Sequence, residues 1–249
     1  MKPYYQEPNI TIYNGDCLEV MNGMEQVDCV ITSPPYNMRT RIRNGEYTQR
    51  EKSEHFSKKY TEFDDGLPIK EYCNFHKSII NKMLLISPMV FLNIQIVTGS
   101  KEVWFALIGE FNKHIKDIII WDKGTGQPAM HNSVINRGYE MILILEAPVS
   151  AGRAFKSSYF KRGTMPDVWR LGRGGNGKAK GHGAVFPKKL VYKILENWTR
   201  PGATILDPFL GSGTTARACK DLGRKCIGIE ISKEYVDIAI KRLGQEVLF

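Results

Sequence analysis

The chain has 249 residues, of which 42% are hydrophobic and 24% charged; this suffices for a folded domain and excludes a disordered or fibrous protein. The formal net charge of +9 indicates a polyanionic partner such as nucleic acid, with simple solubility as the alternative. The first ten residues contain no apolar signal-peptide core, and the apolar stretch 83–97 is interrupted by Pro88, Asn93 and Gln95, so we expect a cytoplasmic protein outside the membrane. The five cysteines form no C-x-x-C pair and no cluster with zinc spacing, so we expect reduced thiols and no metal site.

The N-terminal part of the chain alternates short apolar runs with helical patterns. In chain order, the apolar runs predict strands at 10–13, 27–31, 89–96, 117–121 and 139–145. The short link between the last two allows an antiparallel pair. Apolar positions at helical spacing predict helices after residue 17, over 68–86 and over 101–114. Residues 37–66 are polar with little periodicity, so we expect a long mobile loop there.

A basic segment follows at 147–183, rich in glycine, lysine and arginine and poor in apolar periodicity. Aromatic residues are interleaved with the charges: Phe155, Tyr159, Phe160 and Trp169. That mixture suits phosphate contacts combined with base stacking. A solvated surface excursion is the alternative.

The C-terminal part predicts half of a doubly wound sheet. A strand at 204–207 leads through a glycine-rich turn into a helix over 216–222, and a second strand at 225–230 precedes a helix that begins at the N-cap Ser232. In the turn, Gly211 and Gly213 allow sharp bending and close approach of a ligand, and the helix N-terminus attracts a carboxylate or phosphate. Glu230 ends the next strand, where an acid accepts hydrogen bonds from ribose hydroxyls. No lysine follows Gly213 as in an ATP-binding P-loop, so a nucleoside-type cofactor is favoured over ATP; a purely structural turn is the alternative.

A second motif, Ser33-Pro-Pro-Tyr36, follows the strand at 27–31. In open α/β sheets, ligands bind beyond the carboxyl ends of the strands. The two prolines fix the backbone and remove two N–H donors, which leaves carbonyl oxygens and the Ser33 hydroxyl as acceptors beside an aromatic ring. Such a site suits a flat substrate that carries an amino group: the ring stacks on Tyr36, while the amine protons bond to Ser33 and to the Pro34 carbonyl. A rigid structural turn is the alternative.

Together these motifs resemble those of DNA amino-methyltransferases, whose catalytic motif is (Asp/Asn/Ser)-Pro-Pro-(Tyr/Phe) and whose cofactor motif contains Phe-x-Gly-x-Gly. The catalytic motif comes first and the basic segment lies between the two, an order similar to that of the circularly permuted beta class. Further similar elements are the acidic turn 14–16 and the segment 182–187 before Lys188, so the resemblance spans nearly the whole chain. It implies a single α/β domain over 1–249 with a Rossmann-like S-adenosylmethionine-dependent methyltransferase fold. The sheet would have seven mostly parallel strands with one antiparallel strand.

The resemblance also implies roles for individual residues. Asp16 would contact the adenine amine of S-adenosylmethionine, Phe209 would pack near its adenine or methionine part, and Glu230 would hold its ribose. The predicted cofactor-binding residues are Asp16, Cys17, Phe186, Lys188, Asp207, Pro208, Phe209, Gly211, Ser212, Gly213, Thr214, Glu230 and Ile231. The predicted catalytic residues are Ser33, Pro34, Pro35 and Tyr36. Two acceptors that draw the target amine toward tetrahedral geometry would free its lone pair for in-line methyl transfer, by positioning and electrostatics alone.

The implied partner is double-stranded DNA, whose target amine lies inside the base stack, so the base must be flipped out. The loop 37–66 would close over the opened site, with an inert loop as the alternative, and 147–183 takes the place of an inserted target-recognition region. The predicted DNA-binding residues are Arg39, Arg41, Arg43, Lys156, Lys161, Arg162, Arg173 and Lys178.

The target base follows less directly from the residues. Serine at position 33 is more usual among the family's cytosine-N4 enzymes and aspartate among its adenine-N6 enzymes, so N4-cytosine is favoured and N6-adenine is the alternative. C5-cytosine methylation is disfavoured because it needs a cysteine nucleophile, usually after a proline, and no proline here precedes a cysteine. Methyltransferases for RNA bases or protein glutamine, and an inactive DNA-binding scaffold, are further alternatives. The recognition sequence, a homodimer and a cognate restriction endonuclease stay open.

Overall fold

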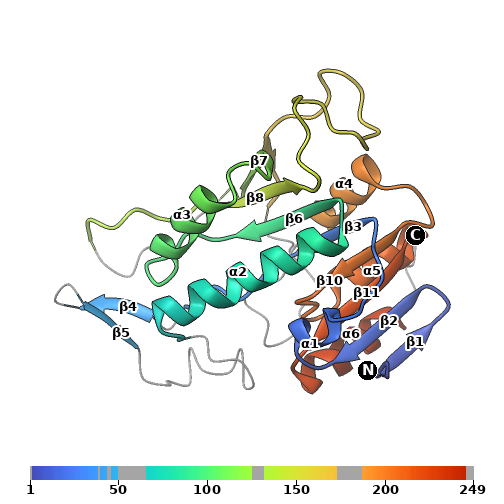
Figure 1. Ribbon diagram of the computed structural model, residues 1–249, viewed down its shortest axis with the longest axis horizontal. Helices are drawn as coiled ribbons and strands as arrows, with labels where there is room; N and C mark the ends of the chain where they lie inside the picture. The colour runs from blue at the N-terminus through green and yellow to red at the C-terminus, as the bar shows by residue number, and fades with distance from the viewer. Residues whose placement is uncertain are drawn as a thin grey trace.

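The computed structural model describes residues 2–38, 40–43, 46–49, 66–124, 132–172 and 187–244. They form one continuous β-sheet flanked by helices, with a separate two-stranded hairpin at one end (Figure 1). The strands of the sheet are β1 (Tyr5–Glu7), β2 (Ile10–Asn14), β3 (Cys29–Thr32), β6 (Met89–Ile94), β7 (Ile115–Asp122), β8 (Tyr139–Glu146), β9 (Val168–Arg170), β10 (Thr204–Asp207) and β11 (Lys225–Glu230). The helices are α1 (Cys17–Met21), α2 (Ile69–Ile86), α3 (Lys101–Glu110), α4 (Lys188–Trp198), α5 (Thr214–Asp221) and α6 (Lys233–Leu243).

The order of strands across the sheet is β1-β2-β11-β10-β3-β6-β8-β7-β9. The stretch from β2 to β7 is the predicted sheet: β2, β11, β10, β3, β6 and β7 run parallel, and β8 runs antiparallel between β6 and β7. The predicted α/β fold class and antiparallel pair are thereby confirmed. The expected count of seven strands was too low, because β1 and β9 extend the two edges and β1 is a second antiparallel strand. Each has only three residues, too few to show the alternation by which a strand is predicted.

Each face of the sheet buries its own hydrophobic core, since successive strand residues point to opposite faces. In β10, Ile205 packs in the core formed with α4, α5 and α6, whereas Leu206 packs in the core formed with α1, α2 and α3. Burial on both faces explains why the central strands β3 and β6 are almost continuously apolar. In the described ranges, no helix has the length and apolar character needed to cross a bilayer.

The parallel strands end along one side of the sheet, which we call the carboxyl edge; the opposite side is the amino edge. The late strands β10 and β11 lie between the early strands β2 and β3, so distant parts of the sequence end together. The Thr32 hydroxyl at the end of β3 donates a hydrogen bond of 2.8 Å to the Asp207 carboxylate at the end of β10. The two motifs singled out in the sequence therefore begin side by side at the edge where α/β sheets bind ligands.

The segment 37–66, predicted to be an irregular loop, contains regular structure in its first part. Strands β4 (Thr40–Arg43) and β5 (Glu46–Gln49) form an antiparallel hairpin that projects beyond the start of α2 (Figure 1). The prediction missed it because the two strands are short and mostly polar. Asn44-Gly45 lies between them in the sequence, and this dipeptide is a strong hairpin signal. Residues 50–65 lie outside the described chain.

Gly99 fits against the backbone that leaves the catalytic motif. A Cβ atom at Gly99 would lie 2.6 Å from the Asn37 carbonyl oxygen and 2.7 Å from Thr40 Cβ. We expect Gly99→Ala to lower the free energy of unfolding by about 1–3 kcal/mol, because backbone must move to admit the methyl group. Gly109→Ala in α3 is the matched control: nothing lies within 4 Å of its added Cβ, so a gain of about 0.5–1 kcal/mol is expected. Urea unfolding that gave both variants equal stability would contradict this account.

Candidate active site

The glycine-rich turn connects β10 to α5 and packs tightly against α6. Gly211 and Gly213 both adopt positive φ, +52° and +79°. A Cβ atom at Gly213 would lie 2.7 Å from Ala239 Cβ, so this glycine is required for close packing of α6 as well as for the turn. The Arg242 guanidinium, also on α6, donates to the Ser212 carbonyl at 3.2 Å and to the Thr214 hydroxyl at 2.8 Å. The turn is therefore held in place by packing against α6 and by hydrogen bonds from Arg242.

Asp207 lies beneath this turn and is only 2% exposed. One carboxylate oxygen accepts from the Thr32 hydroxyl at 2.8 Å and from the Phe209 amide at 3.1 Å, and the other accepts from the Thr215 hydroxyl at 2.6 Å. Burial raises the pKa of Asp207 from 3.8 to about 6, although these hydrogen bonds act in the opposite direction. Asp207 therefore holds the turn in shape from below, and its predicted contact with the cofactor stays a prediction.

The raised pKa of Asp207 makes stability depend on pH. Because the folded protein holds this proton more tightly than the unfolded chain, the stabilisation is complete below pH 3.8 and is lost as the pH rises through about 6. We expect Asp207→Asn, which retains an acceptor for Thr32 and Phe209, to remove this pH dependence, on the order of 3 kcal/mol between the two limits. Urea unfolding from pH 4 to pH 7.5 measures it, with the exposed Asp167→Asn as control. A wild-type slope that persists in Asp207→Asn would contradict the assignment.

Glu230 and the turn 14–16 meet at the end of β11. The Glu230 carboxylate accepts from the Gly211 amide at 2.8 Å and from the Ser232 amide at 2.9 Å, so it fixes both the glycine-rich turn and the start of α6. Ser232 occupies the predicted N-cap position, but its hydroxyl makes no capping bond. The Asn14 side chain donates to the Glu230 carbonyl at 3.0 Å, and this bond holds the turn 14–16 against the end of β11. Asp16 there caps α1 through the Leu18 amide at 2.8 Å.

The catalytic motif follows β3 and is braced from α2. The Tyr72 hydroxyl donates to the Pro35 carbonyl at 2.8 Å, which leaves the Pro34 carbonyl as the motif's candidate acceptor. Phe75, one turn further along α2, contacts Phe209 of the glycine-rich turn edge-on, with 6.1 Å between the ring centroids. One helix therefore supports both motifs.

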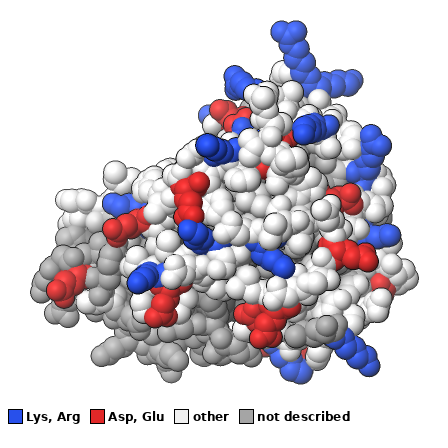
Figure 2. Space-filling view, in the orientation of Figure 1, with Lys and Arg blue, Asp and Glu red and all other residues white. Residues whose placement is uncertain are grey.

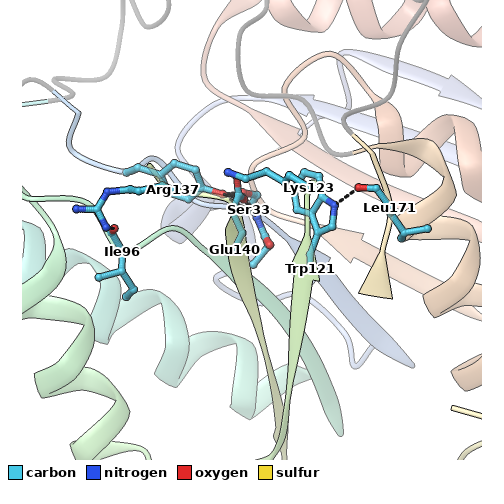
Figure 3. Close-up of polar contacts among 9 residues, drawn as sticks. Ser33, Ile96, Trp121, Lys123, Arg137, Glu140 and Leu171 are labelled. Carbon is cyan, nitrogen blue, oxygen red and sulfur yellow. Dashed lines mark hydrogen bonds and ion pairs between the residues drawn. The ribbon is translucent and has the colours of Figure 1, made fainter. Parts of the chain in front are cut away.

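Three polar side chains that sequence reasoning missed surround Ser33 and Tyr36. Asn93 of β6 donates to the Tyr36 hydroxyl oxygen at 2.7 Å and to Glu140 at 2.6 Å. The Tyr36 hydroxyl donates to the same Glu140 oxygen at 3.0 Å, and Lys123 pairs with the other oxygen at 3.1 Å. Figure 3 shows Ser33, Lys123 and Glu140 converging on one point. We call Ser33, Tyr36, Asn93, Lys123 and Glu140 the polar cluster; within the described chain, no group of three or more His, Cys, Asp or Glu side chains is placed to hold a metal.

Several other predicted cofactor-binding residues are buried or form an ion pair with another part of the protein. Cys17 is buried, and burial raises the pKa of its thiol to about 12, so it is a neutral side chain. Lys188 pairs with Asp221 of α5 at 2.6 Å. Pro208 is buried, whereas Ile231 is 41% exposed at the carboxyl edge. Phe186 lies outside the described residues.

The predicted DNA-binding residues do not share one surface. Because β8 runs antiparallel, the segment after it begins at the amino edge, where the Ala147 amide bonds to the Pro88 carbonyl and the Tyr159 amide to the Asn197 carbonyl. The exposed side chains of Lys156, Lys161 and Arg162 belong to this segment, at the end of the sheet away from Ser33. In Figure 2, basic side chains project from the upper part of the molecule, where Figure 1 places this segment. Among the remaining predictions, only the backbone of Arg41 and Arg43 is described, and the structure does not describe Arg39, Arg173 and Lys178.

With this geometry in place, comparison with known proteins identifies the family. A family model described as a DNA methylase of the N6/N4 type matches residues 27–241, from β3 to α6. The chain belongs to this DNA methylase family.

Relatives of the methylase resemble it along almost its entire length. Type II methyltransferase M.ScaI of Streptomyces caespitosus is 25% identical over 98% of this chain and 84% of its own. Type II methyltransferase M2.LlaDCHI of Lactococcus lactis subsp. cremoris is 29% identical over 98% of this chain and 93% of its own.

Two solved structures share the fold of the methylase. PvuII DNA methyltransferase, named as cytosine-N4-specific, superposes with a TM-score of 0.73 at 19% identity over 100% of this chain and 91% of its own. The M1.HpyAVI–SAM complex superposes with a TM-score of 0.63 at 24% identity over 95% of this chain and 100% of its own. These likenesses confirm the predicted methyltransferase fold.

Proposed function

We propose that this methylase transfers a methyl group from S-adenosylmethionine to the exocyclic amino group of a base flipped out of duplex DNA. The observation that carries the proposal is the hydrogen bond between Thr32 and Asp207, which sets the end of the catalytic strand beside the start of the glycine-rich turn. Family membership supports a DNA substrate. A base pocket and a cofactor pocket on adjacent strands suit direct transfer between two bound molecules.

The residues at the carboxyl edge fit a nucleoside cofactor. The two Glu230 carboxylate oxygens each accept one backbone amide, which holds the carboxylate in place at the carboxyl edge, and a carboxylate is a suitable acceptor for ribose hydroxyls. Asp16 and Phe209 adjoin this point from the neighbouring turns, as expected for contacts with the adenine amine and ring. When bound, S-adenosylmethionine supplies an electrophilic methyl group on a sulfonium centre. Asp207, Ser212 and Thr214 hold the shape of the turn, and Lys188 is assigned to the packing of α4 on α5.

The catalytic motif acts on the base by positioning. The Ser33 hydroxyl and the Pro34 carbonyl accept the two protons of the amino group, and Tyr36 contacts the ring of the base. Two acceptors draw the nitrogen toward tetrahedral geometry and free its lone pair from the ring, which raises its nucleophilicity. The protein forms no covalent bond to the base in this scheme.

N4-cytosine is the favoured target and N6-adenine the alternative. Serine at position 33 supports the cytosine assignment. The likeness in fold to PvuII methyltransferase, which is named as cytosine-N4-specific, agrees with it.

Several segments near Ser33 are candidates for contacts with DNA. Segments at the carboxyl edge are the β4–β5 hairpin, residues 132–138 before β8, and the end of β9, where the Arg170 side chain is 87% exposed. We propose DNA contacts for these segments because a flipped base must enter beside Ser33, and the contacts of Lys156, Lys161 and Arg162 stay predictions. A homodimer and a separate cognate endonuclease stay predictions.

A methyl-transfer assay tests the proposed function. Tritiated S-adenosylmethionine is incubated with mixed-sequence duplex DNA, and the labelled nucleosides are identified by mass spectrometry. N4-methylcytosine is the expected product, and N6-methyladenine would retain the mechanism but reverse the choice of base. Label that appears only in RNA or protein, or in no substrate at all, would overturn the DNA assignment.

A further inference from the structure

The polar cluster contains a carboxylate–lysine pair that the catalytic scheme above does not use. The side chains of Glu140 and Lys123 are 11% and 4% exposed, and 3.1 Å separates their charged atoms. Burying an ion pair is costly and gives little net stability, so its presence beside a reaction centre indicates another role. Glu140 reaches the catalytic motif through Tyr36, at 3.0 Å.

Hydrogen counting fixes the direction of the contacts in the cluster. A carboxylate has no hydrogen to give, so the Tyr36 hydroxyl donates to Glu140. The phenol has one hydrogen and two lone pairs, and Asn93 donates to it at 2.7 Å. In the contact of 2.6 Å between Ser33 Oγ and Tyr36 Oη, Ser33 is therefore the donor. The Asn93 amide nitrogen also lies 3.3 Å from Ser33 Oγ, but its two hydrogens are directed to the nearer Tyr36 and Glu140 oxygens. The Ser33 oxygen therefore has lone pairs to offer to the target amine.

We propose that Glu140 is a positioning residue which, through Tyr36, orients the Ser33 hydroxyl so that its lone pair faces the target amine. The inference rests on the proposed function. Lys123 balances the charge of the Glu140 carboxylate. Asn93 donates to both Glu140 and Tyr36 and so keeps these two side chains next to each other.

A serine hydroxyl needs a partner that fixes its orientation, because it can both donate and accept a hydrogen bond. If Ser33 donated its proton to the target nitrogen, it would occupy the lone pair that forms the new bond and so suppress methyl transfer. An aspartate at position 33 presents oxygens that only accept hydrogen bonds, and needs no partner to orient it. The requirement for Glu140 is therefore specific to serine at this position.

The test compares Glu140→Gln in two backgrounds, the natural Ser33 enzyme and Ser33→Asp. Single-turnover methyl transfer is measured on duplex DNA together with S-adenosylmethionine affinity. With Ser33, Glu140→Gln should reduce the rate about 10- to 100-fold while cofactor affinity stays within about 2-fold, because a charge-assisted hydrogen bond is weakened. In the Ser33→Asp background, the same substitution should reduce the rate less than about 3-fold. Glu196→Gln, exposed on α4, is the matched control and should leave the rate unchanged.

A second cycle tests the path through Tyr36. Tyr36→Phe removes the link, so adding Glu140→Gln to it should cost little further rate. Equal costs of Glu140→Gln in both backgrounds, or full additivity with Tyr36→Phe, would overturn the inference and leave Glu140 a structural residue. Wild-type enzyme that methylates no DNA would instead contradict the proposed function itself, so the two failures are distinguishable.

Discussion

Tyr36→Ala is expected to reduce methyl transfer by about 10²- to 10³-fold while S-adenosylmethionine affinity stays within about 3-fold. The substitution removes the ring proposed to contact the flipped base and also the hydroxyl that joins Ser33 to Glu140. The glycine-rich turn keeps its supports, because Asp207, Arg242 and Glu230 hold it without Tyr36. Single-turnover kinetics and isothermal calorimetry measure the two quantities separately.

The control for this variant is Tyr4→Ala. Tyr4 is 44% exposed and bonds to Asp237 beside β1, far along the sheet from Ser33. It should leave methyl transfer unchanged. If Tyr36→Ala lost cofactor binding to the same extent as methyl transfer, the division of the site into base and cofactor pockets would be wrong.

Glu230→Ala is expected to weaken S-adenosylmethionine binding about 10- to 100-fold, because it removes the predicted ribose acceptor and the carboxylate that holds the Gly211 amide. Methyl transfer at saturating cofactor should fall far less than the affinity. Calorimetry gives the affinity, and the rate is measured over a range of cofactor concentrations.

Glu234→Ala in the first turn of α6 is the matched control, since this glutamate is exposed and four residues from Glu230. It should bind the cofactor as the wild type does. Unchanged affinity in Glu230→Ala would remove the ribose contact from the scheme.

Elements with strong local patterns were predictable from the sequence. The strand before Ser33, the strand and turn around Gly211, and the helix over 69–86 lie where apolar runs and turn residues indicated, and the antiparallel pair β7–β8 is confirmed. Circular permutation and the individual site contacts stay predictions. These predictions succeed because burial of one side of a strand or helix produces a periodic pattern of apolar residues in the sequence.

No periodic pattern in the sequence points to Asn93, Lys123 and Glu140. Each is a polar residue in or beside a largely apolar strand, and they meet only because β6, β7 and β8 are neighbours in the sheet. Their convergence depends on strand register, which a single sequence does not reveal. A polar residue inside an apolar run, such as Asn93, was the one available signal.

The position of the basic segment along the sheet could not be predicted for a topological reason, and its contact with DNA stays a prediction. Its charge was read correctly, but its position along the sheet depends on the direction of β8. An antiparallel strand delivers the following residues to the amino edge, and only β9 brings the chain back toward Lys123.

The hydrogen bond between Thr32 and Asp207 ties together two strands that are direct neighbours. Backbone pairing holds adjacent strands about 4.8 Å apart, a spacing that side-chain substitutions hardly alter. The pairing of β3 with β10 therefore fixes the distance between the proposed base pocket and the proposed cofactor pocket. Substitutions in the loops at the carboxyl edge can alter contacts with DNA without changing this distance.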